Sequence, residues 1–495
     1  MITHSHTPPL VAETGDNMQH QNSSKGPATA VLRLVAMLAA IVMLASACGD
    51  DGGNNADSDG GGDEGASGNT INVPDDQPTI QKAVDAAEPG DLIMVAEGVY
   101  KEAVNVETDR LTIRGADRNT TILDGEFKLE NGIRVLSASG VAVENMTARN
   151  YTTNGFFWTG VDGYRGSYLT AYRNGDYGVY AFDSVNGLLE HSYGSGSPDA
   201  GVYVGQCYPC NMVIDDFVAE NNGLGYSGTN SGGNLAIINS VFRNNRAGIV
   251  PNSGSYELCY PERETDIVGN LVYSNNNGDT PAIDVALLAA GNGIVVPGGM
   301  RNTIERNRVW DHDRTGIGLV PFLEEDANDN QPPEADWDQT CDEQKSKPAT
   351  DPADVENPLL WNPQQNIVRD NLVSESGLAD LGIGSVDTDL STLENCWSDN
   401  EAATSRPKDL QTLAPCDGDQ VGTVAGEGWD VDELNVVAWL SEQADQPASK
   451  DYKTSPEPPE QENMPDAATA PAEPATNMPP EVDLAAVKVP EKPAS

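Results

Sequence analysis

Basic residues are scarce in this chain of 495 residues, where 28 Lys and Arg face 77 Asp and Glu and the formal net charge is −49. This shortage argues against nucleic acid as a partner, because phosphate binding depends on clustered Lys and Arg. The acidic excess is uneven, since residues 131–250 hold nine acids and six bases, whereas residues 321–360 hold twelve acids and two bases. Solvation and self-repulsion of surface segments are the ordinary explanation of such runs.

Histidine is also scarce, and only His191 and His312 lie beyond the first 20 residues. A catalytic triad built on histidine therefore has few candidates. A zinc site would need paired histidines or a second CxxC motif near Cys207 and Cys210, and the sequence has neither there. The CxxC motif also lacks the βαβ surroundings of redox enzymes, so we expect a structural bridge rather than an oxidoreductase.

Repeated helical windows and a dense leucine register are missing as well, which excludes leucine-rich repeats. The pattern present instead is a series of glycines at one constant interval, continued by Gly225 and Gly248 after one extra residue. Apolar residues follow most of these glycines at the next position and again two later, as Val179 and Ala181 follow Gly178. Such a period predicts a solenoid of short strands joined by turns. The first four glycines are Gly132, Gly155, Gly178 and Gly201.

Many repeats carry a second short β-branched or aromatic run that ends in asparagine. Asn tolerates left-handed backbone and can stack amide on amide from rung to rung. With these features the chain resembles the right-handed parallel β-helix superfamily of pectate lyases, rhamnogalacturonases and mannuronan epimerases. The resemblance spans roughly residues 71–400 and implies an all-β, single-stranded solenoid with a repeat of about 23 residues per rung. The runs end at Asn150, Asn174, Asn222, Asn245 and Asn276.

The segment from Asp75 to Ala86 resembles the N-terminal capping helix of many secreted β-helix proteins. Asp76 or Gln77 is expected at the N-cap, with Pro78 in the first turn. At the other end, Asp430 to Glu442 is either a second cap or a surface helix.

The N-terminus resembles a bacterial lipoprotein signal, with cleavage before Cys48 and acylation of its thiol. An uncleaved signal anchor is the alternative. The expected organisation is a signal peptide at 1–47, a flexible Gly/Asp tether at 48–70, the β-helix at 71–400 with an insertion at 321–363, a C-terminal cap region at 401–448, and a disordered Pro/Glu/Ala-rich tail at 449–495. This organisation predicts an extracytoplasmic monomer that is attached to the bacterial cell membrane only through its lipid.

Cysteine usage agrees with export. Without Cys48 an even number of cysteines remains, which suits disulfides in an oxidising compartment. We expect bridges Cys207–Cys210 and Cys396–Cys416, and leave the pairing of Cys259 and Cys341 open.

A carboxylate column precedes the repeat glycines by two positions and places Asp176 and Asp199 on adjacent rungs. At the strand spacing of about 4.8 Å such a pair holds a shared proton or recruits a cation, here Ca²⁺. Arg173, Tyr177 and His191 are near in register and could clamp a substrate carboxylate and transfer protons. The alternative is that each Asp is a solvated turn residue.

An aromatic column follows the glycines by two positions, with Phe157, Tyr180 and Tyr203, and Tyr226 continues it. If Val179 and Val202 point inward, these rings point outward as a platform on which sugar rings stack. In the alternative, a loop covers the rings or the two faces are exchanged.

The epimerase motif TyrGlyPheAspProHis keeps only Tyr177 and Gly178 here, and the AsnThrAsp and GlyHisGly signatures of polygalacturonases are absent. Enzyme status therefore stays open. One hypothesis is an envelope protein that binds or modifies a polysaccharide or cell-wall glycan as a lyase, epimerase or hydrolase. The other is a non-catalytic structural or adhesive surface module.

Overall fold

The computed structural model describes residues 68–324, 359–385, 390–418, 446–472 and 479–493, all within one compact unit of residues 65–495. The expected signal peptide with Cys48, most of the tether, the middle of the insertion and the segment Asp430 to Glu442 lie outside the described residues.

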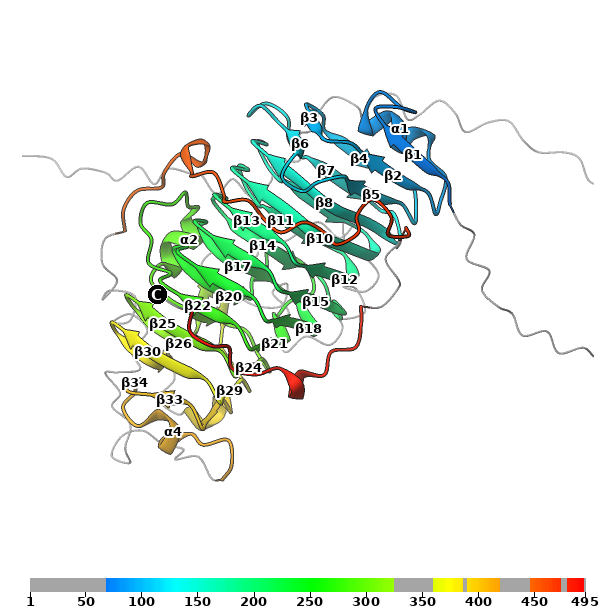
Figure 1. Ribbon diagram of the computed structural model, residues 1–495. Helices are drawn as coiled ribbons and strands as arrows, with labels where there is room; N and C mark the ends of the chain where they lie inside the picture. Colours follow the sequence, from blue (N-terminus) through cyan, green and yellow to red (C-terminus); the bar gives the residue numbers. More distant parts are fainter. Residues whose placement is uncertain (1–67, 325–358, 386–389, 419–445, 473–478, 494–495) are drawn as a thin grey trace, which may run out of the picture. The chain divides into compact units, whose positions relative to one another are not determined.

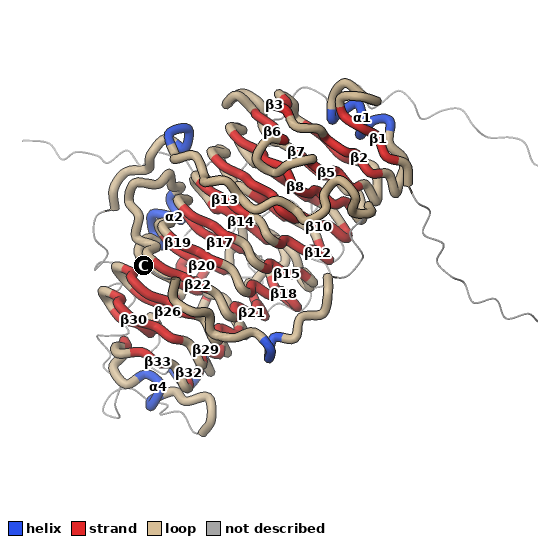
Figure 2. Tube along the Cα trace, in the orientation of Figure 1, coloured by secondary structure: helices blue, strands red, loops and turns tan. Residues whose placement is uncertain are grey.

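The described chain is a right-handed parallel β-helix, in which successive rungs stack from β1 at one end to β33 and β34 at the other (Figure 1). Strands dominate the coil, and helices occur only as short segments (Figure 2). Within the described residues, one sheet of 21 strands and one of 11 strands contain only parallel pairs. A typical rung contributes two strands to the larger sheet and one to the smaller.

The larger sheet consists of β1 (Thr70–Val73), β2 (Leu92–Val95), β3 (Gly98–Tyr100), β5 (Thr112–Gly115), β6 (Thr121–Asp124), β8 (Val141–Arg149), β10 (Asp162–Tyr172), β12 (Val185–Glu190), β13 (Tyr193–Ser195), β15 (Met212–Asp215), β16 (Val218–Glu220), β18 (Gly232–Ile238), β19 (Val241–Arg243), β21 (Arg263–Val268), β22 (Leu271–Tyr273), β24 (Thr303–Glu305), β25 (Arg308–His312), β29 (Ile367–Arg369), β30 (Leu372–Ser376), β32 (Cys396–Ser398) and β33 (Glu401–Ala402). The smaller sheet consists of β4 (Val104–Val106), β7 (Ile133–Leu136), β9 (Phe156–Thr159), β11 (Val179–Phe182), β14 (Ala200–Gly205), β17 (Leu224–Thr229), β20 (Ala247–Asn252), β23 (Ile294–Pro297), β26 (Thr315–Val320), β31 (Ala379–Ile383) and β34 (Ser405–Arg406). The helices are α1 (Ile80–Ala86), α2 (Asp284–Ala289) and α4 (Leu410–Leu413), with 3-10 turns η3 (Leu390–Leu393), η4 (Tyr452–Thr454) and η5 (Leu484–Ala486).

The predicted register is confirmed in the middle of the coil. Val179 pairs with Phe156 on one side and with Val202 on the other, which lie one repeat interval away in each direction. All three side chains are fully buried in the core. The extra residue before Gly225 shifts the next rung, so that Val202 pairs with Tyr226 rather than Gly225, and Tyr203 pairs with Ser227 rather than Tyr226.

Buried asparagines stack along the coil, as predicted for Asn222 and Asn245, but the next rung uses Asn275 rather than Asn276, and the Asn150 amide donates to Asp124 instead. The Asn222 amide nitrogen Nδ2 donates to Asn245 Oδ1, and the Asn245 Nδ2 donates to Asn275 Oδ1, each at 3.0 Å. The backbone N–H of Asn245 donates to the same Asn275 oxygen at 3.1 Å. The ladder therefore satisfies turn backbone groups that water cannot reach.

The two ends of the coil differ in detail from expectation. α1 begins after Thr79, whose side chain accepts from the Lys82 N–H, rather than after Asp76 or Gln77. Asp76 instead accepts from the backbone N–H of Asn72 and forms a turn before the helix. At the far end strand pairing continues to Arg406, beyond the predicted limit at residue 400, and Leu410 of α4 packs into the core.

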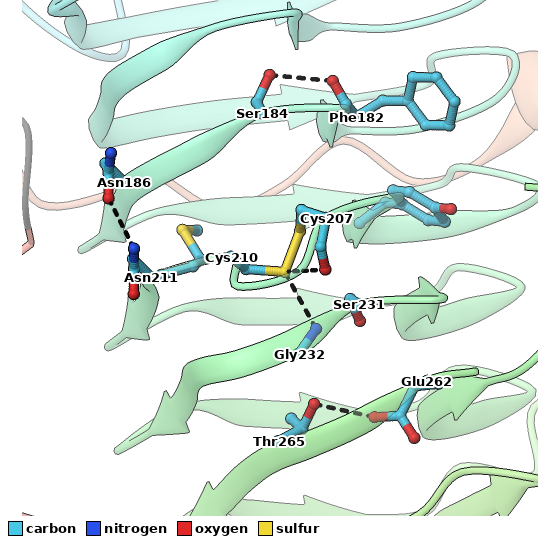
Figure 3. Close-up of a disulfide and its surroundings, with 12 residues drawn as sticks. Phe182, Ser184, Asn186, Cys207, Cys210, Asn211, Ser231, Gly232, Glu262 and Thr265 are labelled. Carbon is cyan, nitrogen blue, oxygen red and sulfur yellow. Dashed lines mark hydrogen bonds between the residues drawn. A yellow bond between two sulfur atoms is a disulfide. The ribbon is translucent and has the colours of Figure 1, made fainter. Parts of the chain in front are cut away.

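Both predicted disulfides form, Cys207–Cys210 and Cys396–Cys416. Figure 3 shows the first between neighbouring rungs, where Gly232 N–H donates to Cys210 Sγ and Asn211 donates to Asn186. This bridge lies within a turn of the coil, as expected of a structural clip. Cys259 is also disulfide-bonded.

The predicted insertion leaves the coil as two antiparallel strands, β27 (Phe322–Glu324) and β28 (Leu359–Trp361). Its base is fixed by Glu324, which accepts hydrogen bonds from the Ser255 hydroxyl and from Trp361 Nε1.

The prediction of a disordered tail is wrong for the described part of residues 449–495. Residues 446–472 and 479–493, which we call the C-terminal strap, run along the coil (Figure 1, orange and red). Arginines of the coil donate to strap carbonyl oxygens, as Arg306 does to Val487 and Leu484. A Pro-rich composition gives the segment no core of its own, but the coil supplies donors and an apolar surface.

In the part of the chain that the structure describes, no helix is long and apolar enough to cross a membrane.

Asn245→Ala should lower the free energy of unfolding by about 1–3 kcal/mol, because it leaves the buried amide of Asn222 without its acceptor. The exposed Asn105→Ala is the matched control, with an expected change of about 0.5 kcal/mol or less. Urea denaturation of both variants measures the difference. Equal midpoints for the two would show that the ladder does not stabilise the coil.

Candidate functional site

The site begins with the predicted carboxyl pair, which the structure brings together. Asp176 precedes β11 and Asp199 precedes β14, at the same corner of adjacent rungs. The backbone N–H of Asp199 donates to the Asp176 carbonyl oxygen at 3.2 Å, and the Asp176 N–H donates to the Thr153 carbonyl oxygen at 2.9 Å. The corner therefore continues the rung-to-rung hydrogen bonding of the sheets.

Asp199 is buried against Tyr177, whose hydroxyl donates to Asp199 Oδ2 at 2.6 Å. Tyr177 is held in turn by a parallel stack on Tyr180, with ring centroids 4.3 Å apart. Burial and the neighbouring Asp176 charge raise the pKa of Asp199, and the Tyr177 hydrogen bond offsets part of that rise. Burial also raises the pKa of Tyr177, so its hydroxyl keeps its proton.

Asp176 is only partly buried, in contrast to Asp199. Desolvation raises the pKa of Asp176 as well. Among the described residues none donates a hydrogen bond to its carboxyl group. The pair thus combines a buried Asp199, oriented by Tyr177, with a partly buried Asp176 whose carboxyl group accepts no hydrogen bond from the described residues.

A third carboxyl group belongs to the same region and was missed from the sequence. Glu257, in the loop between β20 and β21, accepts from the Tyr203 hydroxyl at 2.6 and 2.7 Å. Burial raises the pKa of Glu257 to about 8, and the charge of Asp199 adds to that rise. Glu257 lies in a loop outside the repeat register, so the spacing of the glycines does not predict its position.

The predicted aromatic platform is wrong as an exposed surface. Tyr180 and Tyr203 do lie on the outer face of the smaller sheet, but only 2% and 1% of their surface is exposed. They share one buried apolar cluster with Ala286 and Ala289 of α2, and the Tyr203 hydroxyl contacts Glu257, so the column is covered. Phe157 is partly buried and stacks on Tyr180 at 4.7 Å.

The prediction that Tyr226 lies on the outer face with the other aromatic residues is wrong. The extra residue before Gly225 pairs Tyr226 with Val202 and Ile249, so its ring occupies the core. A one-residue shift moves a strand side chain to the opposite face.

Arg173 and His191 do not join the carboxyl pair. The His191 imidazole lies at the corner between β12 and β13, where its Nδ1 is 2.7 Å from Asp216 Oδ2. Arg173 lies three positions before Asp176, but its guanidinium donates to Ser455 O of the strap at 2.6 Å and contacts Glu457. A position close to Asp176 or Asp199 in the repeat register therefore does not predict the direction in which a side chain points.

The corner does not fit the calcium ion that the sequence suggested. Ca²⁺ takes six to eight oxygen ligands. Within the described ranges no group of three His, Cys, Asp or Glu residues could hold a metal ion. In addition, Asp199 Oδ2 already accepts a hydrogen bond from the Tyr177 hydroxyl. Proton transfer is the chemistry that this arrangement supports.

No model of a known protein family matches the sequence. No curated protein matches it either.

Several solved structures are similar to the chain at low identity. The A-module of an Azotobacter vinelandii mannuronan C-5 epimerase shares 15% identity, over 65% of this chain and 90% of that one, with a TM-score of 0.42. An alginate lyase from a Paenibacillus species shares 17% identity, over 51% of this chain and 91% of that one, with a TM-score of 0.36. A mannuronic acid specific polysaccharide family 6 lyase from the human gut microbiota shares 12% identity, over 73% and 90%, with a TM-score of 0.37. These values assign no activity to this chain.

Asp199→Asn should make the thermal stability of the protein less sensitive to rising pH. A carboxyl group with a raised native pKa contributes stability below its unfolded pKa, near 3.9, and loses it as pH rises through the native pKa. The wild-type melting temperature should therefore fall between pH 5 and pH 9 by several degrees more than that of Asp199→Asn. Differential scanning calorimetry measures this, with exposed Asp75→Asn as the control. Parallel pH profiles for all three proteins would contradict the raised pKa.

Proposed function

We propose that this protein binds or modifies a polysaccharide at the corner formed by Asp176, Tyr177 and Asp199. The observation that carries the proposal is the partly buried Asp176, whose carboxyl group accepts no hydrogen bond from the described residues, beside the enclosed Asp199–Tyr177 hydrogen bond. Burial keeps both carboxyl pKa values above their ordinary range, which suits proton donation and acceptance near neutral pH.

The chemical roles follow from the environments of the two acids. Asp176 is the group that a ligand can reach, and it exchanges a proton with a sugar hydroxyl, ring carbon or glycosidic oxygen. Asp199 is the reservoir, because Tyr177 fixes its orientation and the charge of Asp176 opposes ionisation of Asp199. A lyase, an epimerase and a hydrolase all use such a donor and acceptor, so the site supports the class rather than one reaction.

A non-catalytic structural or adhesive module is the second candidate. It is favoured by the burial of Tyr180 and Tyr203 under α2, which removes the platform for sugar stacking. In this reading the tyrosines and carboxyl groups stabilise the junction between α2 and the coil.

We also propose an extracytoplasmic location with a lipid anchor at Cys48. The two disulfides support an oxidising compartment. Labelling of cells with radioactive palmitate, compared between wild type and Cys48→Ser, tests the anchor. Equal labelling of the two proteins would exclude acylation of Cys48.

The double substitution Asp176→Asn with Asp199→Asn should lower the turnover of any polysaccharide that the wild type modifies by at least about 100-fold. The reason is that proton transfer by a positioned side chain contributes a rate acceleration of about that size. Glycan arrays identify the bound polymer, and chromatography of its oligomers measures product. Asp75→Asn is the control and should keep wild-type activity.

Retained turnover in the double variant would remove the carboxyl pair from the chemistry. Binding without product from any polymer would favour the non-catalytic module. If neither wild type nor variant binds any glycan, the proposed function itself is wrong.

A further inference from the structure

The C-terminal strap passes beside the carboxyl corner. The Arg173 guanidinium donates to the Ser455 carbonyl oxygen and lies 3.3 Å from Glu457 Oε1. A side chain on Gly196, three positions before Asp199, would begin 2.6 Å from Ser455 Cβ. A side chain on Gly175, next to Asp176, would begin 3.2 Å from the Tyr452 ring. Residues 452–457 of the strap therefore lie against the backbone that carries both acids.

The next rungs hold the beginning of the strap through a buried cation. Arg246 is fully buried, and it donates to the Pro447 and Ala448 carbonyl oxygens of the strap at 2.8 and 3.2 Å. Its other acceptors are the carbonyl oxygens of Gly278 and Thr280. Burial lowers the pKa of Arg246.

Arg118 repeats this arrangement further along the strap. It is buried, donates to the Glu462 carbonyl oxygen at 3.1 Å, and burial lowers its pKa to about 10. Among the described residues neither Arg118 nor Arg246 has a hydrogen bond to a carboxylate. Carbonyl dipoles solvate these cations, and Asp216 and Asp279 attract Arg118 and Arg246 without a hydrogen bond, whereas an anionic group in direct contact is a stronger partner for guanidinium.

The two halves of the strap are held by different forces. Val482, Leu484 and Val487 pack on an apolar patch of the larger sheet formed by Val213, Ala236, Ile238 and Val268. The first half uses mainly polar contacts, including the Lys450–Asp279 ion pair at 3.3 Å, which is largely exposed to solvent, together with an edge-on contact between the Tyr452 and Phe127 rings. Exposed ion pairs contribute little stability. Residues 446–457 can therefore detach as a unit, while the hydrogen bonds of buried Arg114 to the Ala470 and Pro471 carbonyl oxygens and the apolar half keep them tethered.

We propose that residues 446–457 are a displaceable self-ligand, which occupies Arg173 and Arg246 and restricts access to Asp176 and Asp199. The Glu457 carboxylate on Arg173 stands in the position of an anionic group of an incoming ligand. This inference rests on the proposed function for the identity of the competing ligand. The part that treats the strap as a self-ligand rests only on the contacts between the strap and the coil.

The first experiment measures strap binding without any glycan. In an open variant, residues 446–457 are replaced by a Gly/Ser sequence of equal length, so that the apolar anchor at 482–487 remains. A fluorescent peptide of residues 446–457 should bind the open variant, and binding should weaken about tenfold or more when Arg173→Ala is added. Absence of peptide binding to a folded open variant would overturn the self-ligand.

The second experiment measures competition in the full chain. A short oligogalacturonate is the probe, and its methyl-esterified form is the neutral control. If the strap is closed about 90% of the time, the open variant should bind the acidic probe about tenfold more tightly than wild type. The probe should also raise amide hydrogen exchange at residues 449–457 and leave 482–487 unchanged.

Glu457→Lys provides a milder test that does not depend on the replaced segment folding. Glu457→Lys reverses the charge that faces Arg173 and should tighten binding of the probe. The control Glu460→Lys makes the same change of charge at an exposed strap residue and should tighten binding less. Equal affinities for wild type, Glu457→Lys and the open variant would overturn the competition. Peptide binding without glycan binding by any variant would support the self-ligand and contradict the proposed function.

Discussion

The structure depends on parallel backbone hydrogen bonding between rungs that are one sequence repeat apart. This register puts Val179 over Phe156 and under Val202, and so builds the core from single residues of successive rungs. The same register carries the buried asparagine ladder and places Asp176 beside Asp199. Because two acids on adjacent rungs face one another in a partly desolvated corner, their protonation becomes coupled to the integrity of the coil.

Two later segments complete the corner from outside the register. α2 covers the tyrosines of the smaller sheet, and the loop that carries Glu257 closes over Tyr203. The strap then passes the open side, where Arg173 binds Ser455. The coil therefore supplies the acids, whereas insertions and the C-terminal segment determine what can reach them.

The sequence was informative wherever a residue acts through the repeat. The rung length, the Asn222–Asn245 step of the asparagine ladder and the adjacency of the acids follow from spacing, because these neighbours in space are separated by one period. Tyr226 shows the limit, since one extra residue before Gly225 reverses its face. The cover over Tyr180 could not be predicted, because α2 is a short helix in a segment without the period. The prediction of a disordered strap is wrong because composition indicates only how much apolar surface a segment can bury by itself. It does not indicate that arginines of the coil donate hydrogen bonds to the carbonyl oxygens of the segment.

The most direct test of this account is a carbon-13 NMR titration of the aspartate carboxyl groups, with Asp176→Asn and Asp199→Asn used for assignment. The account predicts two carboxyl resonances that titrate well above the ordinary range near 3.9, with the Asp199 midpoint falling when Asp176 is replaced. Two independent midpoints at ordinary values, unaffected by either substitution, would contradict a coupled carboxyl pair at this corner.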